Sequence, residues 1–130
     1  MPQVTERPLL LIVEDHADTR QMYAEFLGMS YDVQEAADGE QALDAMRRRV
    51  PSLVITDFSL PGMDGFELVR RMRSEVATRE VPVICLSGYG GRRHEQGAQA
   101  IGCNRVLEKP CMPDKLADTA RELLQERQAS

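Results

Sequence analysis

Short apolar runs alternate along this chain with longer segments of helical periodicity. Four runs, at 9–13, 53–56, 83–86 and 106–107, consist of aliphatic residues apart from one threonine and one cysteine. A continuous apolar run of this length is typical of a strand that is buried on both faces, as in a parallel sheet. The stretch 31–36 alternates instead, which predicts a half-buried edge strand.

Between these runs, apolar residues recur at the spacing of helices. The first predicted helix follows the first run and ends near Gly28. Two further helices begin at capping-box patterns, Asp38 with Gln41 and Asp64 with Glu67. The apolar positions of the first helix are Met22, Tyr23, Phe26 and Leu27.

The remaining helix signals differ in strength. Pro51 ends the helix that begins after Asp38. The segment 92–101 predicts a weaker helix, because Gly97 interrupts it and its apolar side is mostly alanine. An amphipathic helix begins at Pro113 and runs to the polar tail. Strand and helix therefore alternate about five times, which predicts a single α/β domain over 1–130, with a core of about 8–127 and helices on both faces of a parallel sheet.

Composition narrows the classes of protein. The chain has 130 residues, 42% of them hydrophobic and 28% charged, as in globular domains. A formal net charge of −5 without a basic stripe argues against direct binding to nucleic acid. With no basic leader and no run of membrane-spanning length, we expect a cytoplasmic protein without membrane contact. The spacing of Cys85, Cys103 and Cys111 argues against a disulfide framework or a zinc site built on cysteines.

Residues able to handle a phosphoryl group follow each fully apolar run. Glu14 and Asp15 follow the first, Asp57 the second, Ser87 the third and Lys109 the fourth. Parallel strands bring their carboxyl ends to one edge of a sheet, where ligands bind in open α/β folds. Two carboxylates about 4 Å apart repel by roughly 4 kcal/mol at an effective dielectric constant near 20, so such a cluster favours a bound cation. Mg²⁺ prefers these oxygen ligands.

Four fragments in this order resemble a known family. They are 11–15 (Leu-Ile-Val-Glu-Asp), 57–65 (Asp-Phe-Ser-Leu-Pro-Gly-Met-Asp-Gly), 86–88 (Leu-Ser-Gly) and 109–110 (Lys-Pro). Over almost its entire length the chain is similar to the receiver domain of two-component response regulators, which are bacterial signalling proteins. The resemblance implies a flavodoxin-like doubly wound (βα)5 fold with a five-stranded parallel sheet of order 2-1-3-4-5.

The resemblance also implies a role for each residue at the strand ends. Asp57 would be the phosphoacceptor, Ser87 the switch hydroxyl and Lys109 the phosphate-binding lysine. The domain would catalyse its own phosphorylation and dephosphorylation without being an enzyme toward other substrates. The metal site, for Mg²⁺ or Mn²⁺, would consist of Glu14, Asp15, Asp57 and the backbone carbonyl of Ser59.

Partners follow from the same resemblance. The phosphoryl donor would be a sensor histidine kinase or a histidine phosphotransfer protein. Phosphorylation would change the binding of a downstream protein target, and a weak homodimer is compatible with this role. Whether the domain stands alone or is part of a larger regulator is left open by the sequence.

Some positions depart from the pattern of the family. Val106 stands where many receivers carry an aromatic switch residue, Cys111 where phenylalanine is common, and Gly88 where alanine is common. We therefore expect any phosphorylation-linked change to be carried by the glycine-rich segment 88–91 and the helix after it, with Tyr89 as its reporter.

Two alternatives of a different class remain. A phosphohydrolase with an aspartyl-phosphate intermediate, as in haloacid-dehalogenase-like enzymes, would carry a second aspartate two residues after the nucleophile, where this chain has Ser59. A binding module that is never phosphorylated would not need the complete set of site residues. His16 and His94 are interpreted as surface residues rather than phosphorelay histidines.

Overall fold

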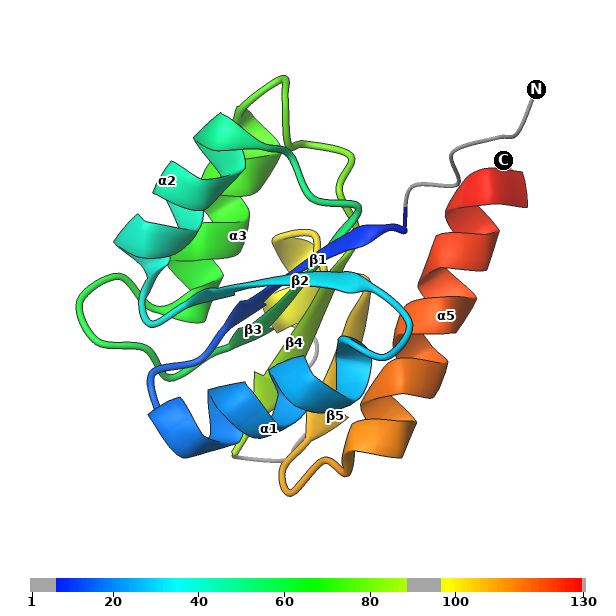
Figure 1. Cartoon of the computed structure of the whole chain (residues 1–130). Helices are drawn as coiled ribbons and strands as arrows, with labels where there is room; N and C mark the ends of the chain where they lie inside the picture. Colours follow the sequence, from blue (N-terminus) through cyan, green and yellow to red (C-terminus); the bar gives the residue numbers. More distant parts are fainter. Residues whose placement is uncertain (1–6, 89–96, 130) are drawn as a thin grey trace.

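The computed structural model describes residues 7–88 and 97–129, and they form one parallel five-stranded sheet with helices on both faces (Figure 1). The strand order is β2-β1-β3-β4-β5, and every neighbouring pair is parallel. This confirms the predicted fold and strand order. The strands are β1 (Leu9–Val13), β2 (Asp32–Ala36), β3 (Leu53–Asp57), β4 (Val83–Ser87) and β5 (Arg105–Glu108).

The helices divide between the two faces of the sheet. Helices α1 and α5 cover one face, while α2, α3 and the helical residues 97–100 lie on the other (Figure 1). No helix within the described ranges is both long and apolar enough to cross a membrane. The helices with assigned bounds are α1 (Ala17–Leu27), α2 (Gly39–Arg48), α3 (Gly65–Ser74) and α5 (Pro113–Ala129).

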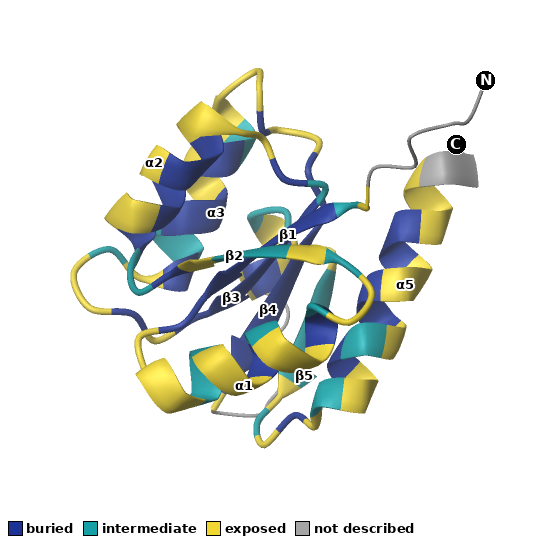
Figure 2. Cartoon of the chain, viewed as in Figure 1, coloured by how far each residue is buried: buried dark blue, intermediate teal, exposed yellow. Residues whose placement is uncertain are grey.

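The side chains of each central strand belong to two separate hydrophobic cores, one on each face of the sheet. In β1, Leu11 and Val13 pack toward α2 and α3, whereas Leu10 and Ile12 pack toward α1 and α5. Successive side chains of a strand point to opposite faces, and both faces are covered here, so every residue of β1, β3 and β4 is buried (Figure 2). This burial explains the continuous apolar runs. Each fully buried aliphatic side chain contributes roughly 1.5–3 kcal/mol.

Side-chain caps fix the starts of two helices. The Asp38 carboxylate accepts from the N–H of Gln41 at 2.8 Å, and the Gln41 side chain accepts from the N–H of Ala37. The Asp64 carboxylate accepts from the N–H of Glu67 at 2.9 Å. The Glu67 side chain instead pairs with arginines one turn further along α3, so only half of the second predicted capping box forms.

Three sequence predictions need correction or are tested only in part. Helix α2 ends at Arg48 rather than at Pro51, because the backbone is already extended at Arg49. In α1, Tyr23 and Leu27 are buried, but Met22 is 44% exposed and Phe26 36% exposed. The predicted helix at 92–101 is helical at 97–100, and the rest of it up to residue 96, like most of the glycine-rich segment 88–91, lies outside the described residues.

Arg73 joins segments at the edge of the sheet away from the strand ends that carry the acids. Its guanidinium donates to the carbonyl oxygens of Val81 and Gly102, each at 2.7 Å, and to that of Arg79 at 3.0 Å. Gly102 has a φ of 102°, a conformation that favours glycine. Arg73 thereby ties the end of α3 to the turns that precede β4 and β5.

Candidate functional site

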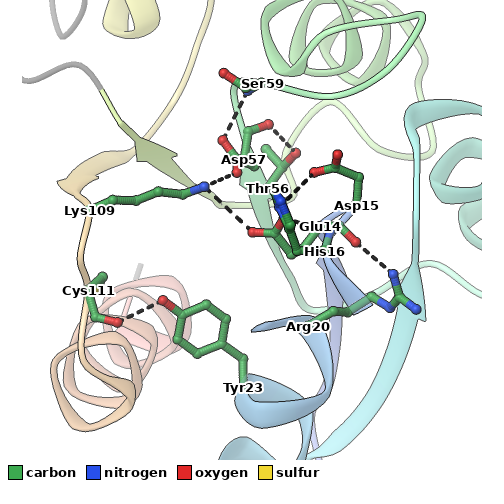
Figure 3. A network of polar contacts seen from close by, with 10 residues as sticks. All are labelled: Glu14, Asp15, His16, Arg20, Tyr23, Thr56, Asp57, Ser59, Lys109 and Cys111. Atoms are coloured by element: carbon green, nitrogen blue, oxygen red, sulfur yellow. Dashed lines mark hydrogen bonds and ion pairs between the residues drawn. The ribbon is translucent and has the colours of Figure 1, made fainter. Parts of the chain in front are cut away.

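Asp57 and Lys109 form the centre of a polar site at the carboxyl edge of the sheet. Asp57 is the last residue of β3 and is 2% exposed. Lys109 follows β5, and its ammonium bonds to Asp57 Oδ2 while lying 3.7 Å from Glu14 Oε1 (Figure 3). The Lys109 N–H donates to the carbonyl of Ser87 at 2.8 Å, which fixes the start of the lysine side chain beside β4.

Glu14 is a buried carboxylate whose two oxygens have different surroundings. It follows β1, is 1% exposed, and accepts at Oε2 from the N–H of His16 at 3.0 Å. Its Oε1 is buried without a hydrogen-bond partner among the described residues. Burial raises the pKa of Glu14, and the charge of Asp57 adds to this, while the His16 N–H and the Lys109 ammonium act in the opposite direction.

The electrostatic balance keeps Lys109 charged. Burial lowers the pKa of Lys109, but the hydrogen bond and charge of Asp57, together with the charge of Glu14, outweigh it and raise this pKa overall. The lysine is therefore an ammonium at neutral pH. It neutralises part of the charge of the carboxylates around it.

The backbone around Asp57 holds its carboxylate in place. The N–H of Ser59 donates to Asp57 Oδ1 at 3.0 Å, so each carboxylate oxygen has a donor. Helix α3 starts against the same backbone, since a Cβ added at Gly65 would lie 2.4 Å from the Asp57 carbonyl oxygen. The N–H of Gly65 also donates to the carbonyl of Phe58 at 2.9 Å.

The predicted site residues lie at the same edge of the sheet. Ser87 is buried at the end of β4, one residue beyond Leu86, which is the register partner of Asp57. Asp15 follows Glu14, and its side chain is 37% exposed. Contacts join Glu14, Asp57 and Lys109 directly, and sheet register places Ser87 next to them.

His16 also borders this site, a position that the sequence did not predict. Its side chain is 77% exposed, as expected for a surface residue, but Nδ1 lies 3.4 Å from Glu14 Oε2 and 3.6 Å from Asp15 Oδ1 (Figure 3). The sequence feature that could have indicated this location is the position of His16 directly after Glu14 and Asp15. Glu14, Asp15 and His16 each offer one ligand atom within 4.8 Å of the others.

An apolar cavity of about 570 Å³ opens beside the site, and it was also not predicted. Met22 and Tyr23 line it from α1, and Cys111 and Met112 line it from the loop after β5. The Tyr23 hydroxyl donates to the Cys111 carbonyl at 2.7 Å, and burial raises the pKa of Tyr23 to about 12. This bond ties α1 to the loop that begins at Lys109.

A substitution of Glu14 tests the effect of its burial. Because its pKa is raised, the folded state binds this proton more tightly than the unfolded state, and the associated stability is lost as the pH rises through the folded pKa. We expect Glu14→Gln to stabilise the protein without divalent cations at pH 7 by about 1 kcal/mol. This advantage should shrink toward pH 4, near the ordinary glutamate pKa.

Thermal melts from pH 4 to pH 8 in a chelator would measure this effect. Glu122→Gln, on an exposed face of α5, is the matched control and should show no such trend. A lower melting temperature for Glu14→Gln at pH 7 would contradict the expected cost of the buried charge.

A family model and the sequences of known proteins match this chain over most of its length. The family model described as the response regulator receiver domain matches residues 10–121. Response regulator Rre1 of Synechocystis sp. is 33% identical over 123 residues, which are 93% of this chain and 53% of Rre1. Sporulation initiation phosphotransferase F of Bacillus subtilis is 34% identical over 116 residues, covering 88% of this chain and 92% of that protein.

Solved structures agree with these sequence matches. The chemotaxis response regulator CheY4 of Vibrio cholerae superposes with a TM-score of 0.85 and 30% identity, covering 90% of this chain and 98% of that chain. The chain spans about half the length of Rre1, and 51% of the phosphate regulon regulator PhoB of Pseudomonas aeruginosa.

Proposed function

This chain belongs to the family of response regulator receiver domains, and from that premise we propose that Asp57 accepts its phosphoryl group. Receiver domains act in two-component signalling and are signalling domains rather than enzymes that turn over a substrate. The observation that carries the assignment is the pairing of the buried Asp57 carboxylate with the Lys109 ammonium. Donors bind both Asp57 carboxylate oxygens, the Ser59 N–H at Oδ1 and the Lys109 ammonium at Oδ2.

The chemistry of the transfer needs positioning more than a strong nucleophile. An Asp57 oxygen would form a bond to phosphorus while the bond from phosphorus to the donor breaks, and the leaving group keeps that electron pair. Such transfers pass through a loose transition state, so fixed geometry and neutralised charge supply most of the catalysis. Ser59 N–H and Lys109 hold the carboxylate. The Ser87 hydroxyl would donate to a phosphoryl oxygen, a contact specific to the modified state.

The residues of the site fit a divalent cation with oxygen ligands. The buried Glu14 Oε1, which lacks a hydrogen-bond partner in the part of the chain described, and the excess of carboxylates over ammonium groups both favour one. When bound, Mg²⁺ would supply positive charge to the phosphoryl oxygens. Glu14, Asp15, Asp57 and the Ser59 carbonyl would hold it.

A small acyl phosphate tests this proposal without any partner protein. We expect one phosphoryl group to be added per chain in a Mg²⁺-dependent reaction. Intact-protein mass spectrometry would measure this addition. Continuous release of inorganic phosphate at many turnovers per minute would instead support a phosphohydrolase. Absence of modification under these conditions would support an unphosphorylated binding module.

The apolar cavity beside the site is the surface that we propose for docking of a protein donor. A phosphohistidine must reach Asp57, and the cavity lies next to Glu14 and Lys109 at that approach. Met22 and Met112, 44% and 65% exposed, offer it an apolar surface. We propose that the phosphohistidine domain of a sensor kinase or a phosphotransfer protein packs there. A downstream target would bind a surface that changes on phosphorylation.

Replacing both exposed methionines should separate protein donors from small ones. We expect Met22→Gln/Met112→Gln to slow transfer from a phosphohistidine protein at least about tenfold, because burying one Met side chain contributes roughly 1.5–3 kcal/mol. Phosphorylation by a small acyl phosphate should change less than twofold. Val76→Gln, at another exposed apolar residue, is the control. Equal slowing with the phosphohistidine protein and the acyl phosphate would show that the substitutions impair phosphoryl transfer itself rather than docking of the protein donor.

A further inference from the structure

Hydrogen bonds hold the loop between β5 and α5, which carries Lys109, at its start, middle and end. At the start, the Lys109 N–H donates to the Ser87 carbonyl at 2.8 Å. In the middle, the Cys111 carbonyl accepts from the Tyr23 hydroxyl at 2.7 Å (Figure 3). At the end, the Met112 carbonyl accepts at 3.1 Å from an N–H in the first turn of α5. Of these three bonds, the middle one comes from a side chain, and that side chain belongs to α1.

Helix α1 is itself held to the acidic pair. The Arg20 guanidinium donates to the Glu14 carbonyl at 2.8 Å, and the N–H of His16 donates to Glu14 Oε2 at 3.0 Å. Tyr23 lies one turn further along the helix and is 3% exposed. Tyr23 therefore links the segment that carries Glu14 to the loop that carries Lys109.

This link depends on the Tyr23 hydroxyl rather than on the ring alone. Burial raises the pKa of Tyr23 to about 12, so the hydroxyl keeps its proton and donates at neutral pH. A buried hydroxyl needs a partner, and the Cys111 carbonyl supplies it. Phenylalanine would fill nearly the same space but would leave that carbonyl without this donor.

The position of the loop matters because Lys109 must reach across to β3. Its ammonium bonds to Asp57 Oδ2 and lies 3.7 Å from Glu14 Oε1. The lysine side chain is 31% exposed, so packing encloses it only in part. A lysine also has a long, flexible stem that loses conformational entropy when it is held in one arrangement. The placement of the ammonium therefore depends on where the backbone of the loop lies.

We propose that Tyr23 is a positioning residue for phosphoryl transfer, which holds the Cys111 carbonyl and thereby keeps Lys109 at the Asp57 carboxylate. The inference rests on the proposed function, in which Lys109 neutralises charge beside the phosphoryl group that Asp57 accepts. Tyr23 acts through the loop and does not touch the phosphoryl group. Because such a transfer depends on fixed geometry, a small displacement of the ammonium lowers its rate.

NMR of the full chain with ¹³C-labelled lysine tests the position of Lys109 without any phosphodonor. The chain has two lysines, and the second, Lys115, is exposed in the first turn of α5. We expect the ε-methylene signal of Lys109 in Tyr23→Phe to move toward that of Lys115, which should itself stay unchanged. Tyr31→Phe, at a tyrosine packed against the same core beyond the far end of α1, is the matched control and should leave both lysine signals in place.

The rate of Mg²⁺-dependent phosphorylation by a small acyl phosphate is the second measurement, made at a temperature where every variant is folded. We expect Tyr23→Phe to lower this rate at least about fivefold, as for a misplaced catalytic group, and Tyr31→Phe to change it less than about twofold. In a Lys109→Met background, Tyr23→Phe should lower the rate less than about twofold, because the residue through which it acts is gone.

Either of two results would overturn the inference. One is a Lys109 signal that is unchanged in Tyr23→Phe. The other is a slowing of equal size with and without the Lys109 side chain, which would assign a general effect on the fold to Tyr23.

The proposed function can fail separately from this inference. A Lys109 signal displaced by Tyr23→Phe, in a chain whose wild type no phosphodonor modifies, would contradict the phosphoacceptor role alone. A phosphorylated wild type whose rate and Lys109 signal are the same in Tyr23→Phe would contradict the positioning role alone.

Discussion

Asp57→Asn should abolish formation of the acyl phosphate while the fold is retained. The substitution removes the nucleophilic oxygen with little change in side-chain volume, and the remaining amide oxygen can still accept a hydrogen bond from the Ser59 N–H. We expect modification to fall from one phosphoryl group per wild-type chain to below the detection limit of intact-protein mass spectrometry. The ammonium of Lys109 keeps Glu14 as a partner, so the thermal melting temperature should change by only a few degrees.

The control for this prediction is another exchange of aspartate for asparagine. Asp44→Asn, at an exposed position of α2, should be phosphorylated like the wild type. A full phosphoryl gain on Asp57→Asn would show that another residue is the acceptor. Mapping of the modified peptide would then identify that residue.

Gly65→Ala should destabilise the fold and disturb the phosphoacceptor together. A Cβ at this position would lie 2.4 Å from the Asp57 carbonyl oxygen and 2.8 Å from Phe58 Cα, and both are backbone atoms that cannot rotate away. Alanine favours a helix over glycine by about 1 kcal/mol, but overpacking costs about 1–3 kcal/mol or more. We expect a net loss of stability of roughly 1–2 kcal/mol, a lower melting temperature and slower phosphorylation.

Gly88→Ala provides the comparison for this substitution. A Cβ at Gly88 would have no atom of residues 7–88 or 97–129 within 4 Å, and Gly88 is exposed. Denaturant unfolding should therefore leave its midpoint unchanged or slightly raised. The prediction would be contradicted if Gly65→Ala were as stable as Gly88→Ala and were phosphorylated at the same rate. The close approach of α3 to Asp57 would then affect neither stability nor phosphorylation.

The strands β1, β3 and β4 were predictable from the sequence because the fold covers both sheet faces, whereas the strand order was implied by the resemblance to receiver domains. Burial on both faces favours continuous apolar runs in β1, β3 and β4 up to the polar residues at the ends of β3 and β4, and such runs are conspicuous. The site followed from the same feature, since polar residues within two positions of the end of each run lie at the carboxyl edge of the sheet. The contacts of Lys109 with Asp57 and Glu14 agree with that reasoning.

Features that depend on packing between distant segments could not be predicted in this way. The periodicity of α1 does not distinguish Tyr23, which reaches the Cys111 carbonyl, from Met22, which remains exposed beside the same loop. The ring of Tyr23 lies near the position where Cys111 replaces a common phenylalanine, and only the fold brings these residues together. Val106 packs partly buried against the α2 and α3 side of the core. The predicted role of segment 88–91 in signalling remains a prediction.

Helix α3 contacts residues at both ends of the sheet. At its start, Gly65 rests on the backbone of Asp57, and near its end Arg73 grips the Gly102 carbonyl. Ten helical residues at 1.5 Å each make a rod of about 15 Å between these points. We expect the Gly102 amide signal to shift on phosphorylation in the wild type and much less in Arg73→Met. A displacement of the start of α3 on phosphorylation would then also move the turn around Gly102 at the opposite end of the sheet.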